Sequence, residues 1–272
     1  AAYKAKREKA PDELYGQIPL VKKVLAAFHV PVYEKAGFEA DDIIGTISLL
    51  APRKQVKPPL ETIILSGDAD VFQLVDKHTK AFTLRKGIQD SVLYDEKGIE
   101  KRFGGLRPEQ LIDYKALRGD PSDNIPGVTG VGEKTAIALL LQFGSVDTMY
   151  RELEENTEKA KSLRPRVKEM LLQYRDQAMV SRELALIERH TPIAFTLSDL
   201  AWKDFDEKEI GQLFQSFGFR SLILRLAELH GGAKQKDPAT EKSMDEQASI
   251  IDQLERDGVL SQEIAGVERK LT

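Results

Sequence analysis

The sequence predicts an α/β layer with a mainly parallel sheet, followed by a nearly all-helical region. Up to about residue 96, short apolar runs of strand character alternate with stretches whose apolar residues recur at helical spacing. Beyond that residue the helical spacing continues to about residue 230, divided by one Gly-rich hairpin. We therefore expect an α/β part that precedes a helical part.

The composition is that of a globular protein with a sizeable core, with 41% hydrophobic and 31% charged residues among 272. No apolar run approaches the roughly 20 residues that span a membrane. Cysteine is absent, which excludes disulfides, thiolate metal sites and Cys nucleophiles, and four scattered histidines disfavour a His-based site. Any metal is therefore expected on carboxylates, which favours hard ions such as magnesium or manganese.

The first elements follow from helical periodicity and from proline. Residues 12–28 carry apolar side chains at helical spacing, and Pro19 is expected to break or kink that helix. A short extended run follows at residues 30–33. Residues 40–50 indicate a helix that begins with acidic side chains, and the Pro-rich stretch at 57–59 indicates a linker.

The next elements are strands. Residues 60–65 are apolar throughout except Glu61 and Thr62, which indicates a buried strand. The sequence Ser-Gly-Asp then turns the chain into a short helix at 70–75. Residues 81–84 and 91–94 are expected to pair with each other around a Lys-Gly turn.

The helical part is read from spacing of 3.6 residues per turn. Helices are expected at 96–103, 108–118, 133–143, 146–154, 165–189, 207–217 and 221–229.

The net charge of −4 disfavours a nucleic-acid partner, but the charges are unevenly distributed. Residues 1–30 carry six Lys and Arg against three Asp and Glu, so this stretch could meet phosphates. The acidic middle of the chain could hold cations. Solvated surface charge is the simpler interpretation of each segment taken alone.

The first acidic cluster is Glu39, Asp41 and Asp42, at the start of the helix expected at 40–50. Acidic residues there complement the helix dipole and cap its free N–H groups, so helix capping is one interpretation. Three adjacent carboxylates repel one another unless a cation lies between them. A metal site is therefore the other interpretation.

Two further clusters lie near turns. Asp68 and Asp70 follow a strand at its carboxyl end, where open α/β sheets place their sites, although an N-cap would also explain Asp68. Asp120 and Asp123 lie three residues apart in a Gly/Pro-rich turn, where local hydrogen bonds also favour Asp. The Arg-Gly-Asp tripeptide that includes Asp120 is too short to indicate adhesion.

The Gly-rich hairpin at 127–132 has three interpretations, of which a plain packing turn is the simplest. It approaches a P-loop, but Glu133 separates Gly132 from Lys134, so the required spacing fails, and no buried strand precedes it. It fits better a helix–hairpin–helix, whose glycines let the backbone approach a phosphate and whose second helix offers free N–H groups. Such a hairpin grips the DNA backbone without reading sequence.

Together, seven carboxylates in three clusters and a phosphate-gripping hairpin indicate metal-dependent phosphodiester hydrolysis. Two divalent ions about 3.5–4 Å apart would stabilise the attacking and leaving oxygens in line.

The motifs Glu39-Ala-Asp-Asp, Gly67-Asp-Ala-Asp and Gly119-Asp-Pro-Ser-Asp-Asn, with the hairpin after them, resemble the 5′-nuclease domain of bacterial DNA polymerase I, of the flap endonuclease family. The resemblance runs from residue 1 to about residue 230. It implies a PIN-like (resolvase-like) parallel-sheet core with a helix–hairpin–helix DNA-binding region. It also implies a cytoplasmic, monomeric 5′→3′ exonuclease and flap endonuclease that acts on 5′ flaps and nicked or gapped duplex in replication and repair.

The resemblance assigns roles residue by residue. Lys4 and Arg7 match the family's contacts to the scissile phosphate, and Lys6 lies in the same basic stretch. The hairpin matches a duplex-binding element whose carbonyls hold potassium. The residues matched to DNA binding there are Gly127, Val128, Gly130, Gly132, Lys134 and Thr135. The residues matched to two divalent ions, magnesium or manganese, are Glu39, Asp41, Asp42, Asp68, Asp70, Asp120 and Asp123.

The sequence also departs from the family. The opening strand and the next one, each with a catalytic Asp, are expected upstream of Ala1. Ala69 stands at a place that is usually basic, and residues 53–59 are a Pro-rich variant of a connecting loop. The 272-residue chain is therefore expected to bind DNA weakly and to cut it poorly. A structure-specific DNA-binding module without turnover is the alternative function.

These comparisons predict the organisation of the chain. A partial nuclease core with a remnant of the helical arch is expected at 1–103, and the helix–hairpin–helix region at 104–230. A linker is expected at 231–249 and the start of a covalently joined polymerase module at 250–272.

Overall fold

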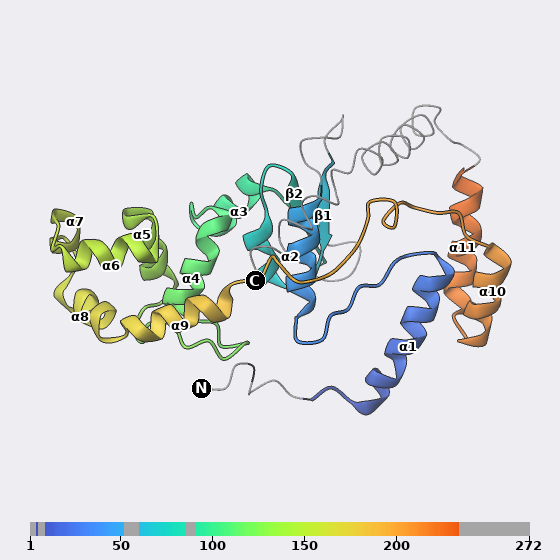
Figure 1. Cartoon of the computed structure of the whole chain (residues 1–272), viewed down its shortest axis with the longest axis horizontal. Coiled ribbons are helices and arrows are strands. Elements are labelled where there is room, and N and C mark those ends of the chain that lie inside the picture. Colours follow the sequence, from blue (N-terminus) through green and yellow to red (C-terminus); the bar gives the residue numbers. More distant parts are fainter. Residues whose placement is uncertain (1–3, 5–8, 52–59, 85–90, 234–272) are drawn as a thin grey trace. The chain divides into compact units, whose positions relative to one another are not determined.

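The computed structural model describes residues 4, 9–51, 60–84 and 91–233 (Figure 1). The chain divides into two compact units. The first unit contains Ala1–Glu8 and Phe38–Thr191, and it therefore combines the α/β part with the helix–hairpin–helix. The second unit contains Lys9–Gly37 and Pro192–Thr272.

The sheet of the first unit has three strands in the order β1-β2-β3, namely β1 (Thr62–Leu65), β2 (Thr79–Leu84) and β3 (Ser91–Tyr94). β1 runs parallel to β2, and β2 runs antiparallel to β3. The predicted pairing of β2 with β3 is confirmed, and among the described residues the sheet has one parallel and one antiparallel pair. Only a few residues separate β2 from β3, which is too short for the crossover that a parallel pair needs.

The core of this unit lies between the sheet and the helices that follow it. The 3₁₀ helix η1 (Ala69–Leu74) buries Phe72 and Leu74 almost completely. The ring centroid of Phe72 lies 4.9 Å from that of Tyr94 on β3. Because η1 starts directly after β1, this packing fixes the acidic residues at the start of η1 against the sheet.

Helix α2 (Ala40–Leu50) has the predicted bounds and contacts η1. Its inner face is close-packed at Gly45, where an added Cβ would lie 2.9 Å from Cγ2 of Ile187. The packing brings the start of α2 beside the chain that follows helix α9 (Arg175–Ala185).

The helical part of the first unit follows the predicted order with three differences. The helix predicted at 108–118 begins as a 3₁₀ helix at 108–110 and continues as an α-helix. Residues 165–189 form two helices, because the chain turns at Tyr174 (φ −106, ψ 21), and the second helix ends at Ala185. The short helix α7 was not predicted. The elements are α3 (Glu96–Arg102), η2 (Pro108–Gln110), α4 (Leu111–Arg118), α5 (Glu133–Phe143), α6 (Val146–Glu154), α7 (Glu158–Lys161), α8 (Pro165–Gln173) and α9 (Arg175–Ala185).

The second unit consists of α1 (Asp12–Ala27), α10 (Glu207–Ser216) and α11 (Arg220–Ala233) around a small apolar cluster. Phe28, after α1, meets Phe205 with ring centroids 4.9 Å apart. Helix α1 continues through Pro19, so the predicted break there is wrong. The extended run predicted at residues 30–33 forms no strand.

Several predictions fall outside the described residues. They concern Lys6, Arg7, the linker at 53–59, the module at 250–272 and the linker predicted at 231–249 beyond residue 233. Residues 231–233 belong to α11, so that linker does not begin at 231. Within the described residues, no helix combines the length and the apolarity needed to cross a bilayer.

Candidate active site

The carboxyl end of β1 holds the first two acidic side chains, as predicted. Asp68 caps η1, since its Oδ1 accepts a hydrogen bond of 3.0 Å from the backbone N–H of Asp70. Ser66 Oγ in turn accepts a 3.0 Å bond from the N–H of Asp68. The capping interpretation is therefore correct for one oxygen of Asp68, and the carboxylate still lines a cavity.

The loop after α4 presents the next pair. Two backbone hydrogen bonds between Asp120 and Ile125, of 2.9 and 2.8 Å, close it into a narrow turn. Ser122 N–H donates to Oδ1 of Asp120 at 3.0 Å. Asp123 is 8% exposed, and no hydrogen bond to its carboxylate is found among the described residues.

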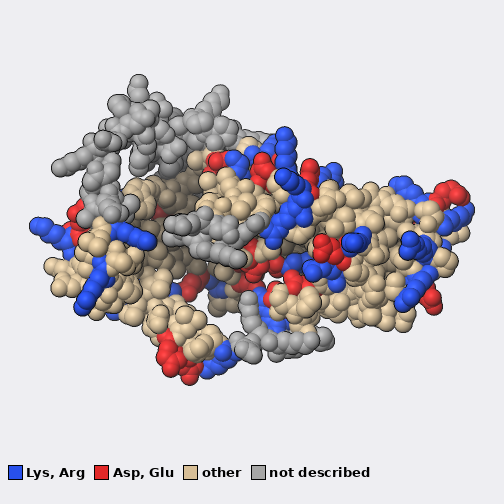
Figure 2. Space-filling model, turned by 180° about the vertical axis from the view of Figure 1, so that it is seen from behind, with Lys and Arg blue, Asp and Glu red and all other residues tan. Residues whose placement is uncertain are grey.

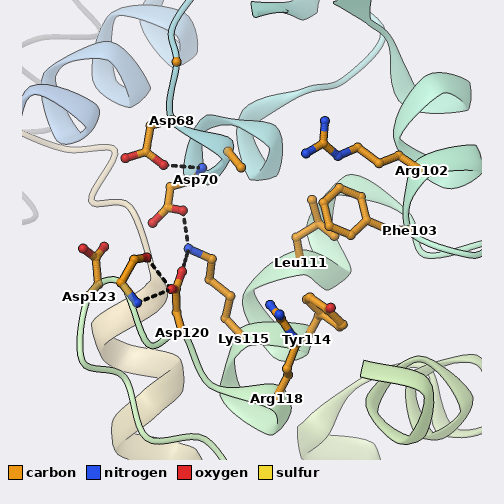
Figure 3. A pocket seen from close by; sticks show the side chains of 13 residues that line it. Asp68, Asp70, Arg102, Phe103, Leu111, Tyr114, Lys115, Arg118, Asp120 and Asp123 are labelled. Atoms are coloured by element: carbon orange, nitrogen blue, oxygen red, sulfur yellow. Dashed lines mark hydrogen bonds and ion pairs between the residues drawn. The ribbon is translucent and has the colours of Figure 1, made fainter. Parts of the chain in front are cut away.

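The three acidic clusters meet at two cavities of the first unit. A cavity of about 550 Å³ is lined by Asp68, Asp70, Asp120 and Asp123 (Figure 3). A second, of about 220 Å³, shares three of these residues. Its wall is completed by Lys4, Glu39, Asp41, Asp42 and residues 183–187. The fold thus brings together all seven acidic residues that the sequence singled out.

Lys115 on α4 is the functional residue that sequence reasoning missed. Its ammonium pairs with Oδ1 of Asp70 and lies 2.8 Å from Oδ2 of Asp120 (Figure 3). The sequence did offer a signal, because Lys115 lies one helical turn before the end of the helix that leads into Asp120.

Burial and charge shift the pKa values of these carboxyl groups. Burial raises the pKa of Asp70 to about 6, with the nearby Asp68 adding to the rise and Lys115 opposing it. At Asp120 burial also raises the pKa, but hydrogen bonds from Lys115 and Ser122 outweigh it and lower the value to about 2. Burial and then the charge of Asp68 raise the pKa of Asp41.

The raised pKa of Asp70 predicts a pH dependence of stability. A carboxyl group with a folded pKa of about 6 and an ordinary value of 3.8 stabilises the fold below pH 3.8, and this contribution is lost as the pH rises through 6. The loss is at most about 3 kcal/mol, since one pKa unit corresponds to about 1.4 kcal/mol. Asp70→Asn should remove it.

Denaturant unfolding of wild type and Asp70→Asn at pH 4, 5, 6 and 7 in chelator measures this effect. As the pH rises from 4 to 7, the free energy of unfolding of wild type should fall relative to that of Asp70→Asn. A difference that stays constant from pH 4 to 7 would show that Asp70 titrates normally.

The cluster at the start of α2 is engaged differently. Asp42 accepts backbone N–H bonds of 2.9 Å from both Glu39 and Glu188, so its carboxylate caps α2 and ties it to the chain after α9. Lys4 pairs with the Glu39 carboxylate. The capping interpretation is thus observed for Asp42, and its role as a metal ligand stays a prediction.

The described residues fit divalent cations, although they are not spaced as a finished metal site. No group of three or more His, Asp or Glu among them has a spacing that could hold a metal ion. Two observations nevertheless indicate a cation position. The Asp123 side chain lines both cavities, and the carboxylates of Asp70 and Asp120 converge on the Lys115 ammonium, which is itself a cation. Carboxylate oxygens are the ligands that magnesium and manganese prefer.

The hairpin is built as a rigid turn between α4 and α5. Gly127 N–H donates to Oγ of Ser181 at 3.1 Å, and Nε2 of Gln177 donates to the Gly127 carbonyl at 2.5 Å. Gly127 has a φ of +61°, and a Cβ there would lie 2.2 Å from the backbone N of Gly119. The hairpin and the Asp120 loop therefore cross with backbone against backbone.

The residues predicted to bind DNA in the hairpin differ in exposure. Gly130, Gly132 and Lys134 are exposed and Thr135 is half-buried. Gly127 is buried and Val128 is 2% exposed, and their backbone N–H groups donate within the fold, to Ser181 Oγ and to the Leu117 carbonyl. Their part in DNA binding stays a prediction. On the face drawn in Figure 2, basic and acidic side chains are interspersed, so attraction of DNA there depends on local groups.

Two family models match the chain. The model described as 5'-3' exonuclease, N-terminal resolvase-like domain, matches residues 1–104. The model described as 5'-3' exonuclease, C-terminal SAM fold, matches residues 106–208.

Curated relatives include DNA polymerase I of Bacillus subtilis, 43% identical over 86% of this chain and 25% of that protein. DNA polymerase I of Bacillus caldotenax is 39% identical over 82% of this chain and 24% of that protein. The chain thus spans about a quarter of the length of these relatives.

Among solved structures, T5 5′-exonuclease with bound zinc ions superposes with a TM-score of 0.54 at 19% identity, over 83% of this chain and 77% of that one. The T5 D15 protein co-crystallised with metal ions gives a TM-score of 0.51 at 22% identity, over 69% and 67%. These likenesses establish the fold.

Proposed function

The chain belongs to the 5′-3′ exonuclease family, and from this we propose that its acidic cavities hold divalent metal ions that serve the hydrolysis of DNA phosphodiesters at 5′ ends and flaps. The observation that carries the proposal is the convergence of three acidic clusters on adjoining cavities. The T5 relative was solved with zinc ions bound, which supports the same chemistry here.

Each group has a role in this proposal. Asp68, Asp70, Asp120 and Asp123 would hold the ions, which when bound polarise a phosphoryl oxygen and supply a nucleophilic hydroxide. Lys4 borders the smaller cavity, where its ammonium would orient the scissile phosphate. Lys115 holds the carboxylates of Asp70 and Asp120 at the same cavity.

Four further proposals concern the identity of the ions, the hairpin, the oligomeric state and the location, and membership of the family does not decide them. We propose two ions of magnesium or manganese, a potassium ion at the hairpin, a monomeric chain and a cytoplasmic location. Joining to a polymerase module is supported by the relatives, which are named DNA polymerase I and of which the matched segment covers only about a quarter.

A DNA-binding module without turnover is the second candidate function. It is favoured by the spacing of the acidic groups, since no three of those described could hold a metal ion as placed. In that case Lys4 and Lys115 would be permanent counterions of the carboxylates.

A labelled 5′-flap duplex separates the two functions. With magnesium or manganese, the nuclease should release the flap near its junction with the duplex, and chelator should stop the reaction. Binding of the flap duplex without release, in the chain and in the longer polypeptide that carries it, would favour the binding module.

The hairpin predicts a salt-dependent, sequence-independent grip on duplex DNA. Lys134→Gln should weaken binding to all sequences alike and reduce the slope of log K against log salt by about 0.9, the contribution of one neutralised phosphate. Lys161→Gln is the control, because Lys161 is exposed and pairs with Glu158 away from the hairpin. Fluorescence anisotropy at several salt concentrations measures both slopes. Equal slopes for the two variants would remove Lys134 from the interface.

A further inference from the structure

One wall of the larger cavity is lined by residues other than the acidic ones. Arg102 at the end of α3 and Arg118 at the end of α4 both line it, with Phe103, Leu111 and Tyr114 (Figure 3). In this view Arg102 extends into the cavity above the Phe103 ring, and the Arg118 guanidinium lies beside the Tyr114 ring. The cavity thus has an acidic wall and a wall of guanidinium and aromatic groups.

Arg102 is held in place by aromatic rings. Its guanidinium carbon lies 5.0 Å from the ring centroid of Phe72, 5.3 Å from that of Tyr94 and 5.6 Å from that of Phe103. Its Nη1 also donates a 2.8 Å hydrogen bond to the hydroxyl of Tyr94. This leaves the guanidinium pre-organised with further N–H groups available.

Arg118 is placed in a similar way. Its guanidinium carbon lies 5.7 Å from the ring centroid of the buried Tyr114. In the described part of the chain, neither Arg102 nor Arg118 forms an ion pair with a carboxylate. Lys115 differs, because Asp70 and Asp120 already share its charge. Two positive charges without a carboxylate partner therefore face one cavity.

We propose that Arg102 and Arg118 form a binding site for the phosphate group of a nucleotide, whose sugar or base packs against Phe103 and Leu111. Planar guanidinium groups match phosphate oxygens in pairs, and aromatic rings offer a surface on which any base can pack. The volume of about 550 Å³ lies within the range of small-ligand pockets. The choice of a nucleotide as ligand rests on the proposed function.

Two sources could provide this phosphate. One is the terminal phosphate of a released 5′-mononucleotide, and the other is a phosphodiester within a strand that leads away from the acidic wall. Both present the same oxygens to the guanidinium groups. The experiment therefore compares thymidine 5′-monophosphate with a short single-stranded oligonucleotide.

Titration calorimetry of the 272-residue chain in chelator tests the site without the metal ions. Arg118→Gln and Arg102→Gln should each weaken the binding of the phosphate ligand about tenfold, since each removes charge-assisted hydrogen bonds. Arg102→Lys keeps the positive charge over the rings, and it therefore serves as a control for a folding defect caused by loss of that charge. Arg107→Gln is the matched control, because Arg107 is an exposed arginine of the same region that pairs with Glu109.

The outcomes separate this proposal from the proposed function. Weaker binding of the mononucleotide in the variants supports a product site, and weaker binding of the oligonucleotide alone supports a strand site. Unchanged affinity for both ligands in Arg118→Gln overturns the proposal even if the flap duplex is cleaved normally. Arginine-dependent binding in a chain that cleaves no flap would uphold this site and leave the nuclease to be judged by its own flap assay.

Discussion

Asp68→Asn is expected to lower metal-dependent cleavage by about 100-fold or more, because it removes an anionic ligand from the acidic cavity and with it several kcal/mol of transition-state stabilisation. Asparagine keeps the size of the side chain and remains a good N-cap. The hydrogen bond of 3.0 Å from the Asp70 N–H can therefore persist, and the fold should be unaffected. The measurement is the flap cleavage rate with magnesium, together with the unfolding midpoint.

Asp95→Asn is the matched control for this variant. Asp95 caps α3 as Asp68 caps η1, with its Oδ1 accepting a 2.7 Å hydrogen bond from the N–H of Gly98, and it lines neither acidic cavity. If Asp68 only caps a helix, both substitutions should leave cleavage near normal. A large loss confined to Asp68→Asn would assign its carboxylate to the metal site.

Gly127→Ala is expected to destabilise the first unit by about 3 kcal/mol or more. The new Cβ would lie 2.2 Å from the backbone N of Gly119, and the residue would have to hold a φ of +61°. Overpacking and left-handed backbone each cost about 1–3 kcal/mol, and backbone atoms cannot move aside as a flexible side chain can. Because Gly119 precedes Asp120, the same clash should disturb the acidic cavity.

Gly132→Ala is the comparison for Gly127→Ala, because it adds the same methyl group to the hairpin without a clash. An added Cβ at Gly132 meets nothing within 4 Å, and the residue caps α5 with an ordinary φ of −93°. Stability should fall by less than about 1 kcal/mol, while duplex affinity falls because the methyl group stands between the backbone and a phosphate. Denaturant unfolding and anisotropy measure the two effects. Similar stability of both variants would contradict the close crossing at Gly127.

The helical part of the fold could be predicted well from sequence because its signals are local. Residues 133–143 show helical spacing directly after the glycines of the hairpin, and α5 has these bounds. The interruption of the helix at Tyr174 could not be predicted, because the helical spacing of apolar residues continues across it from Val167 to Val180. At Pro19 the local signal was present but was not followed. A proline commonly breaks a helix, yet α1 continues through it.

The candidate site could be predicted from sequence only in part. The acidic residues form short motifs, so each cluster is visible in the chain. Their counterions are not, because Lys115 meets Asp70 only through the packing of α4 beside η1. Arg102 is likewise unremarkable in sequence, and only the fold places it over the rings of Phe72 and Tyr94. Contacts between side chains that are distant in sequence leave no periodic pattern in the sequence.

The most direct test of the metal site is a manganese titration of the 272-residue chain, followed by electron paramagnetic resonance of the free ion at pH 7.5. Wild type and Asp95→Asn should bind manganese with the same affinity, and magnesium should compete. Asp68→Asn and Asp123→Asn should bind it at least tenfold more weakly, with unchanged unfolding midpoints in chelator. Equal manganese binding by all four proteins, or no binding by wild type, would contradict the assignment of these carboxylates to a metal site.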